Sequence, residues 1–181
     1  MTMNLPNKIT VARVLMIPFF VIFMVFKNIP NHNYIALGIF IVACLTDALD
    51  GHLARKNKMV TNFGKFMDPL ADKLLVCSAL ICFVELGTLD AWIVIVIISR
   101  EFIISGFRLI ASDNGVVIAA SYWGKFKTTA QMIMSILLIL NFNSTFFNVL
   151  ETVFVYISLC LTVISLVDYM VKNKDVLRER G

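Results

Sequence analysis

The stretch that decides the fold is ACLTDALDGHLARKNKMVTNFGKFMDPLADKL, residues 43–74. It joins two apolar runs, 33–46 and 74–84, which contain 14 and 11 residues. Neither run can cross about 30 Å of hydrocarbon at about 1.5 Å per residue. Each becomes long enough only if its helix continues into the aspartates of this stretch. The sequence therefore predicts a hairpin of two spanning helices whose acidic ends meet at one membrane face.

Composition excludes most other classes of protein. Of the 181 residues, 59% are hydrophobic and 15% are charged, against about 45–50% and about 25% in soluble domains. A soluble globule of this size could not bury so much apolar surface, and disordered chains are far more polar. The net charge of +4 is too small to indicate a nucleic-acid partner. What remains is an all-α integral membrane protein, and we expect residues 1–181 to form one membrane domain.

Six transmembrane helices fit a chain of this length, since each span takes about 20 residues. Besides the two helices of the hairpin, we expect a first helix at 10–27 after a short interfacial segment over 3–9. No small-residue cleavage site follows the first apolar run, so we interpret it as a retained helix and not as a signal peptide. The last three helices are expected at 91–110, 126–143 and 147–170.

The basic residues predict the orientation of these helices. If the N-terminus is cytoplasmic, 13 of the 16 Lys and Arg residues fall on or near the cytoplasmic side, and only Lys27 falls outside. Such a bias places both termini in the cytoplasm under the positive-inside rule. Six spans without a transit peptide fit a plasma membrane, so we expect a multi-pass protein of that membrane.

Four aspartates lie near the predicted cytoplasmic face. Asp47 and Asp50 are three residues apart, and Asp68 and Asp72 are four apart, so each pair shares a helix face. Four carboxylates around one small volume repel each other unless some are protonated or a cation is bound. An all-oxygen site suits a hard divalent ion such as Mg²⁺, Mn²⁺ or Ca²⁺. Solvated helix ends, or an N-cap role for Asp68, would explain a single aspartate but not four.

The aspartates belong to a longer pattern: DALDGHLAR at 47–55, then Gly64, Asp68 and Asp72. This pattern, over residues 47–72, resembles the signature of the CDP-alcohol phosphatidyltransferases, and all eight signature positions are present at the expected spacing. The six-helix layout is consistent with that family over the whole chain. Members transfer a phosphatidyl group from CDP-diacylglycerol to an alcohol and release CMP.

The resemblance implies a role for each matching residue. The aspartates would hold a pair of divalent ions, Mg²⁺ or Mn²⁺, and the last of them would also act as general base: Asp47, Asp50, Asp68 and Asp72. The nucleotide part of CDP-diacylglycerol would be seated by Gly51, Arg55, Thr61 and Gly64. From spacing alone, ordinary close helix packing is an equal explanation for the small residues. The family also implies a homodimer in the lipid membrane.

Shorter motifs bear on the acceptor alcohol. NLPNKIT at 4–10, ISREF at 98–102 and GKFKT at 124–128 resemble the branch of the family that makes phosphatidylglycerol phosphate from sn-glycerol 3-phosphate. This acceptor is anionic and needs a basic pocket. The candidates for its phosphate are Arg108, Lys125 and Lys127. The two lysines open a predicted helix, where an anion is favoured, but a purely topological role is equally consistent with them.

Arg100 and Glu101 lie mid-span in the fourth predicted helix, where ionisable residues are usually functional or paired. Because adjacent helical residues point in different directions, we do not expect these two to pair with each other.

Other functions stay open at this point. Within the same family, the acceptor could be phosphatidylglycerol, serine or inositol phosphate. A small divalent-cation transporter could use the four carboxylates as its pathway, but it would carry polar residues through both halves of the bilayer. Here the dense cluster of carboxylates lies at one face, and the outer ends of the predicted helices carry no comparable cluster, which favours the transferase.

Overall fold

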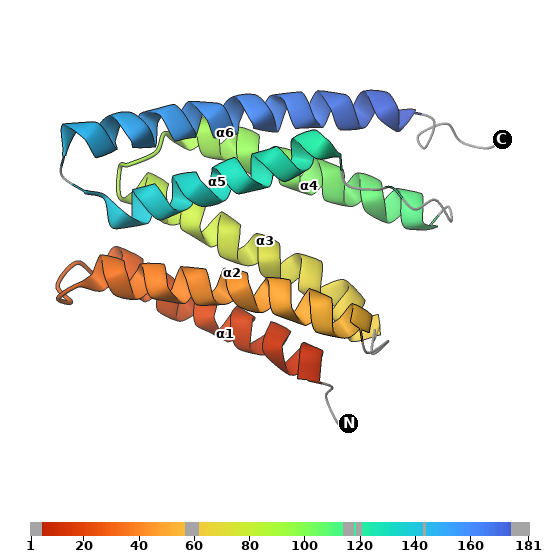
Figure 1. The fold of residues 1–181 in the computed structure, drawn as a ribbon, viewed down its shortest axis with the longest axis horizontal. Coiled ribbons are helices and arrows are strands. Elements are labelled where there is room, and N and C mark those ends of the chain that lie inside the picture. Colours follow the sequence, from red (N-terminus) through yellow and green to blue (C-terminus); the bar gives the residue numbers. More distant parts are fainter. Residues whose placement is uncertain (1–4, 57–61, 114–117, 119–120, 143, 175–181) are drawn as a thin grey trace. The chain divides into compact units, whose positions relative to one another are not determined.

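The computed structural model describes residues 5–56, 62–113, 118, 121–142 and 144–174, and Figure 1 shows their arrangement. For 5–6, 47–56, 62–69, 72 and 112–113 it describes the backbone and not the side chains. These residues form six α-helices, so the all-α fold class is confirmed. The helices are α1 (Leu5–Val25), α2 (His32–Lys56), α3 (Asn62–Glu85), α4 (Ala91–Asp113), α5 (Tyr122–Leu140) and α6 (Thr145–Lys172).

The two helices of the predicted hairpin do continue through the acidic stretch. α2 has 25 residues and extends past Asp50 to Lys56, and α3 has 24 residues and begins before Asp68. At about 1.5 Å per residue, each helix is about 36 Å long, which is enough to cross a bilayer.

Two predicted helix starts were too late by four or more residues, those of α1 and α5. α1 begins at Leu5, so the residues expected to form a separate interfacial segment are, from Leu5 onward, part of the first helix. Pro6 does not prevent this, because the first turn of a helix has no use for the N–H that proline lacks. α5 begins at Tyr122 because Ser121 caps it: the Ser121 Oγ accepts a hydrogen bond from the Gly124 N–H at 3.1 Å.

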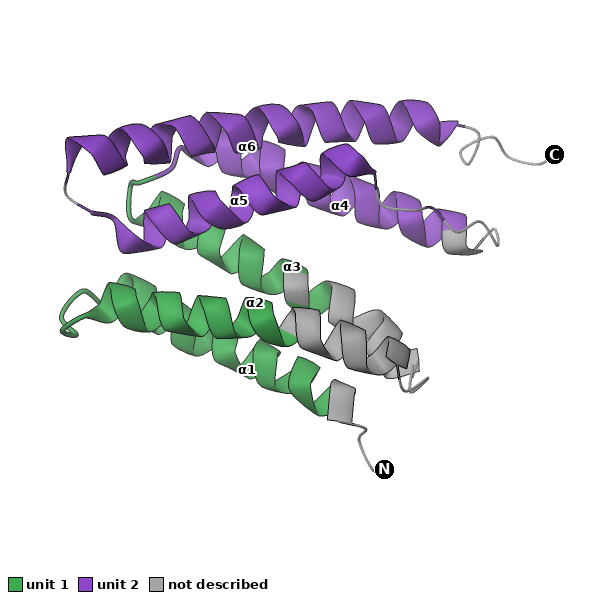
Figure 2. Cartoon of the chain, in the orientation of Figure 1, with its two compact units in different colours: residues 1–88 green, residues 89–181 purple. Residues whose placement is uncertain are grey.

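The chain divides into two compact units, coloured in Figure 2. The first, residues 1–88, contains α1, α2 and α3, and α1 packs against both of its neighbours. Phe20 of α1 and Phe40 of α2 are fully or almost fully buried in this unit, with ring centroids 5.8 Å apart. The turn between these helices is short, and His32 Nδ1 lies 3.1 Å from the Phe23 carbonyl oxygen, so α1 and α2 are antiparallel neighbours.

The second unit, residues 89–181, contains α4, α5 and α6, and α6 packs against both of the other helices. α6 is polar inside and apolar outside, the reverse of a helix in a soluble protein. Its buried face includes Ser158, Thr162 and Ser165. Its exposed large apolar side chains are Phe146, Val149, Val153, Tyr156, Ile157, Val163, Ile164, Val167 and Val171.

This distribution is typical of a helix in a lipid bilayer, where apolar side chains face the lipid and small polar side chains pack between helices. By length and hydropathy, the stretch Asn7–Val25 of α1 and the whole of α6 are each able to cross a membrane.

Candidate functional site

The helices of the first unit carry the signature residues. Asp47 and Asp50 lie in the second half of α2, and Asp68 and Asp72 lie in the first half of α3. Only five residues separate the two helices, so these two segments belong to the same end of the hairpin. The helical backbone therefore gives each aspartate pair the spacing that places both members on one face.

The side chains of the signature lie outside what the structure describes. This holds for the four aspartates and for Gly51, Arg55 and Gly64, while Thr61 lies outside the described residues altogether. Among the side chains that are described, no three His, Cys, Asp or Glu residues gather into a group able to hold a metal ion. The side chains of the four aspartates proposed as metal ligands are not among those described.

α1 presents a buried polar face to its neighbours in the first unit. Three polar residues of α1 are buried: Asn7 is 7% exposed, Thr10 is 0% exposed and Arg13 is 1% exposed. Burial of polar side chains is unfavourable unless they have hydrogen-bond or charge partners. They follow one another at intervals of three residues, so they lie along one side of α1. Sequence reasoning treated Arg13 only as a positive charge flanking a span and missed this face; the three-residue spacing of polar residues was its signal.

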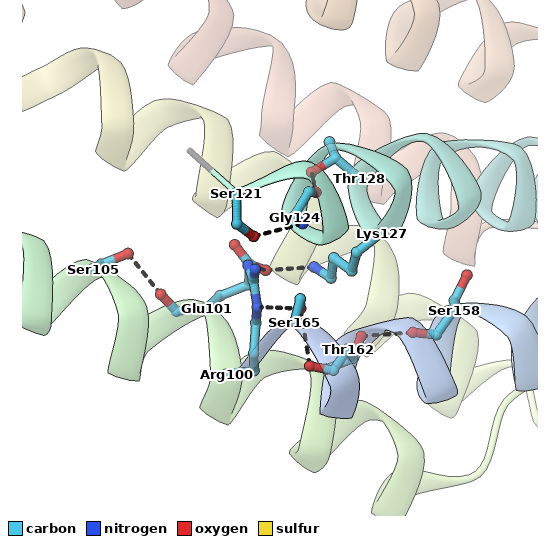
Figure 3. Close-up of polar contacts among 10 residues, drawn as sticks. All are labelled: Arg100, Glu101, Ser105, Ser121, Gly124, Lys127, Thr128, Ser158, Thr162 and Ser165. Atoms are coloured by element: carbon cyan, nitrogen blue, oxygen red, sulfur yellow. Dashed lines mark hydrogen bonds and ion pairs between the residues drawn. The ribbon is translucent and has the colours of Figure 1, made fainter. Parts of the chain in front are cut away.

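A second polar cluster lies within the second unit, where α4, α5 and α6 meet (Figure 3). Glu101 of α4 is its centre: its Oε1 accepts hydrogen bonds from Arg100 Nη1 at 2.9 Å and from Lys127 Nζ of α5. Arg100 and Lys127 are both buried, at 8% and 2% exposure. Two cations thus share one carboxylate, which leaves the cluster with one net positive charge.

Arg100 connects this cluster to α6 and to the start of α5. Its Nε donates to Ser165 Oγ at 3.1 Å, and the Ser165 hydroxyl donates to the Thr162 carbonyl oxygen at 3.0 Å. A Cβ atom at Gly124 would lie 3.5 Å from Arg100 Nη2, so the guanidinium lies against the first turn of α5. The cluster therefore fixes the beginning of α5 relative to the other two helices of its unit.

The expectation that Arg100 and Glu101 would not pair was wrong. Adjacent Cα–Cβ bonds on a helix do point apart, but both side chains are long enough for Arg100 Nη1 to reach Glu101 Oε1. Lys127 reaches Glu101 from α5, and both cations donate to the same carboxylate oxygen, Oε1, which can accept more than one hydrogen bond.

The three basic residues predicted to bind an acceptor phosphate have different environments. Lys127 is buried and paired with Glu101. Lys125 is exposed, and its Nζ lies 5.5 Å from the centre of the Tyr122 ring. Arg108, near the end of α4, is exposed as well. Lys125 and Lys127 lie in the first two turns of α5, and the N–H groups at a helix start favour an anion.

Comparison with known proteins identifies the family. The family model described as CDP-alcohol phosphatidyltransferase matches residues 3–164. The chain belongs to the CDP-alcohol phosphatidyltransferase family. A Bacillus subtilis protein named CDP-diacylglycerol–glycerol-3-phosphate 3-phosphatidyltransferase is 44% identical over 97% of this chain and 97% of its own length.

Two further relatives of this phosphatidyltransferase have closely related names. A Haemophilus influenzae protein with the same name as the Bacillus subtilis one is 42% identical, over 94% of this chain and 93% of its own length. A Mycobacterium tuberculosis protein named probable phosphatidylglycerophosphate synthase is 38% identical, over 93% of this chain and 81% of its own length. The resemblance read from residues 47–72 is therefore confirmed along almost the whole chain.

The Glu101 cluster of this phosphatidyltransferase yields a stability prediction. Glu101→Gln leaves two buried cations without their carboxylate, and breaking a buried ion pair from one side costs about 3–5 kcal/mol. We expect a clearly lower melting temperature in detergent. Glu85→Gln removes an exposed carboxylate at the end of α3 and is the matched control. Equal melting temperatures for the two variants would contradict a stabilising role for the cluster.

Proposed function

We propose that this phosphatidyltransferase transfers the phosphatidyl group of CDP-diacylglycerol to sn-glycerol 3-phosphate, giving phosphatidylglycerol phosphate and CMP. The single observation that carries the proposal is the near full-length similarity to relatives named for this reaction, at 42% and 44% identity. The signature stretch supports the choice of phosphatidyl donor, and the motifs over 4–10, 98–102 and 124–128 support the choice of acceptor.

We infer a single multi-pass membrane domain over residues 1–181, with all six helices crossing the plasma membrane and both termini in the cytoplasm. The exposed apolar side chains of α6 support a lipid environment. The helix lengths and the uneven distribution of Lys and Arg support the number of spans and their orientation. The donor's acyl chains can then remain in lipid while its nucleotide meets the cytoplasm. A homodimer in this membrane is the assembly that we expect for the family.

The residues of the signature fit a pair of divalent ions. Four carboxylates, in pairs on two continuous helices at one end of a hairpin, are a donor set suited to Mg²⁺ or Mn²⁺. Asp47, Asp50, Asp68 and Asp72 would hold the ions. When bound, divalent ions neutralise the charge that develops on phosphoryl oxygens during attack on a diphosphate.

The chain's own residues would bind and activate the two substrates. Asp72 would accept the proton from the attacking hydroxyl of the acceptor, which must lose it to form the new phosphate ester. The nucleotide end of the donor would be seated by Gly51, Arg55, Thr61 and Gly64. Glycines allow a ligand to approach the backbone closely, and an arginine can hold a phosphate with two parallel hydrogen bonds.

The acceptor's phosphate would bind to basic residues of the second unit. Lys125 is exposed beside the start of α5, and Arg108 is exposed on α4, so both side chains are accessible to a soluble anion. Lys127 is held by Glu101, and it would act on the acceptor through the net positive charge of its cluster.

The proposed activity predicts which acceptor will release CMP. The purified full chain, with CDP-diacylglycerol and Mg²⁺, should release CMP with sn-glycerol 3-phosphate and at background rates with serine, inositol phosphate or phosphatidylglycerol offered separately. The basic residues attract the phosphate of glycerol 3-phosphate, which serine lacks, and the relatives named for this acceptor support it over the other two phosphate-bearing alcohols. Faster release with one of the other three would reassign the acceptor within the family, and no release with any of them would refute the transferase.

The proposed ions predict a requirement for added metal. Exhaustive chelation should abolish CMP release, since the four carboxylates would then repel both each other and the donor's diphosphate. Added Mg²⁺ or Mn²⁺ should restore it. Undiminished turnover after chelation, with metal content checked by elemental analysis, would eliminate the metal site.

The proposed base predicts the effect of one substitution. Asp72→Asn keeps the shape of the side chain but removes its ability to accept the proton, so turnover should fall by at least about 100-fold, the usual scale of a general base. Asp90→Asn, at an exposed position just before α4, is the control and should turn over normally. Native turnover by Asp72→Asn would show that another group is the base.

A further inference from the structure

We propose that Gln131 of α5 and Ser158 of α6 bind the middle hydroxyl of the acceptor and thereby select glycerol 3-phosphate over acceptors that lack this group. The inference rests on the proposed function, because it takes the acceptor's phosphate to lie at the basic residues of the second unit. Neither residue belongs to the signature over 47–72 or to the shorter motifs over 98–102 and 124–128.

Each of these two side chains carries a buried polar atom that is not satisfied by the protein groups described. Gln131 is 4% exposed and Ser158 is 0% exposed. Within the described part of the chain, neither Gln131 Nε2 nor Ser158 Oγ has a hydrogen-bond partner. A buried polar atom without a partner has lost its hydrogen bonds to water and gained none in return, so it is destabilising. Buried polar atoms in folded proteins are almost always paired, and this pair therefore indicates a ligand group that completes them.

Neighbouring hydroxyls on the same two helices are satisfied within their own helix. Ser135 Oγ donates to the Gln131 carbonyl oxygen at 2.9 Å, and Thr162 Oγ1 donates to the Ser158 carbonyl oxygen at 2.7 Å. Burial between these helices does not by itself leave a polar side chain unpaired. The Gln131 amide and the Ser158 hydroxyl therefore differ from the polar groups that serve helix packing.

The two atoms lie on the same side of the Glu101 cluster. α5 and α6 are antiparallel and pack against each other, so steps forward along α5 and backward along α6 lead in one direction (Figure 1). Gln131 is four residues after Lys127, a rise of about 6 Å. Ser158 is seven residues before Ser165, which belongs to the cluster, a rise of about 10 Å. In Figure 3 the Ser158 hydroxyl points toward α5.

The chemistry of the two atoms selects an alcohol hydroxyl as their ligand. Gln131 Nε2 can only donate, whereas Ser158 Oγ can donate or accept. A hydroxyl satisfies both, because its oxygen accepts from Gln131 Nε2 while its proton is donated to Ser158 Oγ. An anionic phosphate oxygen has no proton to donate, and it is already matched by the cations of the Glu101 cluster.

The dimensions of glycerol 3-phosphate match this arrangement. Four covalent bonds of about 1.5 Å separate its phosphorus from its middle hydroxyl, a span of about 5 Å, and a hydrogen bond adds about 3 Å. A phosphate at the Glu101 cluster therefore brings the middle hydroxyl within reach of side chains one to two helical turns away. The Glu101 side chain is 20% exposed, so the cluster is open on that side. The terminal hydroxyl of the acceptor is not used for this contact and stays free to attack the donor.

Substitution of Gln131 tests the contact by a split between the two substrates. In the purified full chain with CDP-diacylglycerol and Mg²⁺, Gln131→Leu should raise the KM for glycerol 3-phosphate about five- to tenfold, the scale of one hydrogen bond between uncharged groups. The KM for CDP-diacylglycerol should stay within about twofold. The melting temperature should not fall, because leucine of similar size replaces a buried amide nitrogen that has no partner among the described residues. Ser135→Ala removes a hydroxyl that is already satisfied on α5 and should change neither KM.

An acceptor without the middle hydroxyl identifies the group that Gln131 binds. For the wild type, the KM for 3-hydroxypropyl phosphate should already exceed that for glycerol 3-phosphate, and Gln131→Leu should raise it by less than about twofold, since the contact is then missing from both sides. Ser158→Ala should show the same pattern. It keeps the experiment decisive if Gln131→Leu does not fold, because the removed Oγ atom also has no partner among the described residues.

Two results would overturn the inference and leave the proposed function intact. The first is a native KM for glycerol 3-phosphate in the folded variants, which would show that the two atoms bind no part of the acceptor. The second is an equal rise in KM for both acceptors, which would show that Gln131 acts on the phosphate through Lys127 and not on the hydroxyl. A wild type that releases no CMP with glycerol 3-phosphate would instead refute the proposed acceptor, and the inference with it.

Discussion

The burial of charge among apolar helices is the constraint on which the rest of this structure depends. A membrane helix gains nothing from an isolated ion, so each buried charge has to be matched by an opposite charge, a hydrogen bond or a bound ligand. The described part of the chain satisfies this rule in two ways. In the second unit Glu101 is paired with Arg100 and Lys127, and in the first unit Arg13 is buried and has an interaction partner.

The second unit shows how a complete polar cluster organises helices in lipid. Glu101 accepts from Arg100 and Lys127, and Arg100 continues through Ser165 to the backbone of α6. Lipid-exposed apolar side chains provide no drive for helices to associate, so polar contacts and close packing of small residues determine how α4, α5 and α6 meet. Because the cluster holds the first turn of α5, it also fixes the capped helix start beside which Lys125 lies.

The donor site proposed for the first unit has to accommodate two parts of one lipid with opposite requirements. A diphosphate needs positive charge and metal ions, whereas its acyl chains need lipid, and the end of a helix hairpin offers both environments within a few ångströms. The acidic segments of α2 and α3 belong to the end of the hairpin where the two helices are joined, and the proposed cytoplasmic position of that end would keep the carboxylates near water. At such a site, a transferase of this family can join a water-soluble acceptor to a membrane-bound donor while the acceptor stays in water and the acyl chains stay in lipid.

The sequence by itself determined the helical class, the continuation of two helices through the aspartates and the family, because apolar run length and the spacing of charged residues are local properties of the chain. It did not determine that Glu101 would draw Arg100 and Lys127 together, nor that Asn7, Thr10 and Arg13 would be buried. Only the tertiary structure decided these points, because burial and pairing depend on which helix faces pack against each other. Helix periodicity states that residues share a face, but the neighbouring helix decides what that face meets.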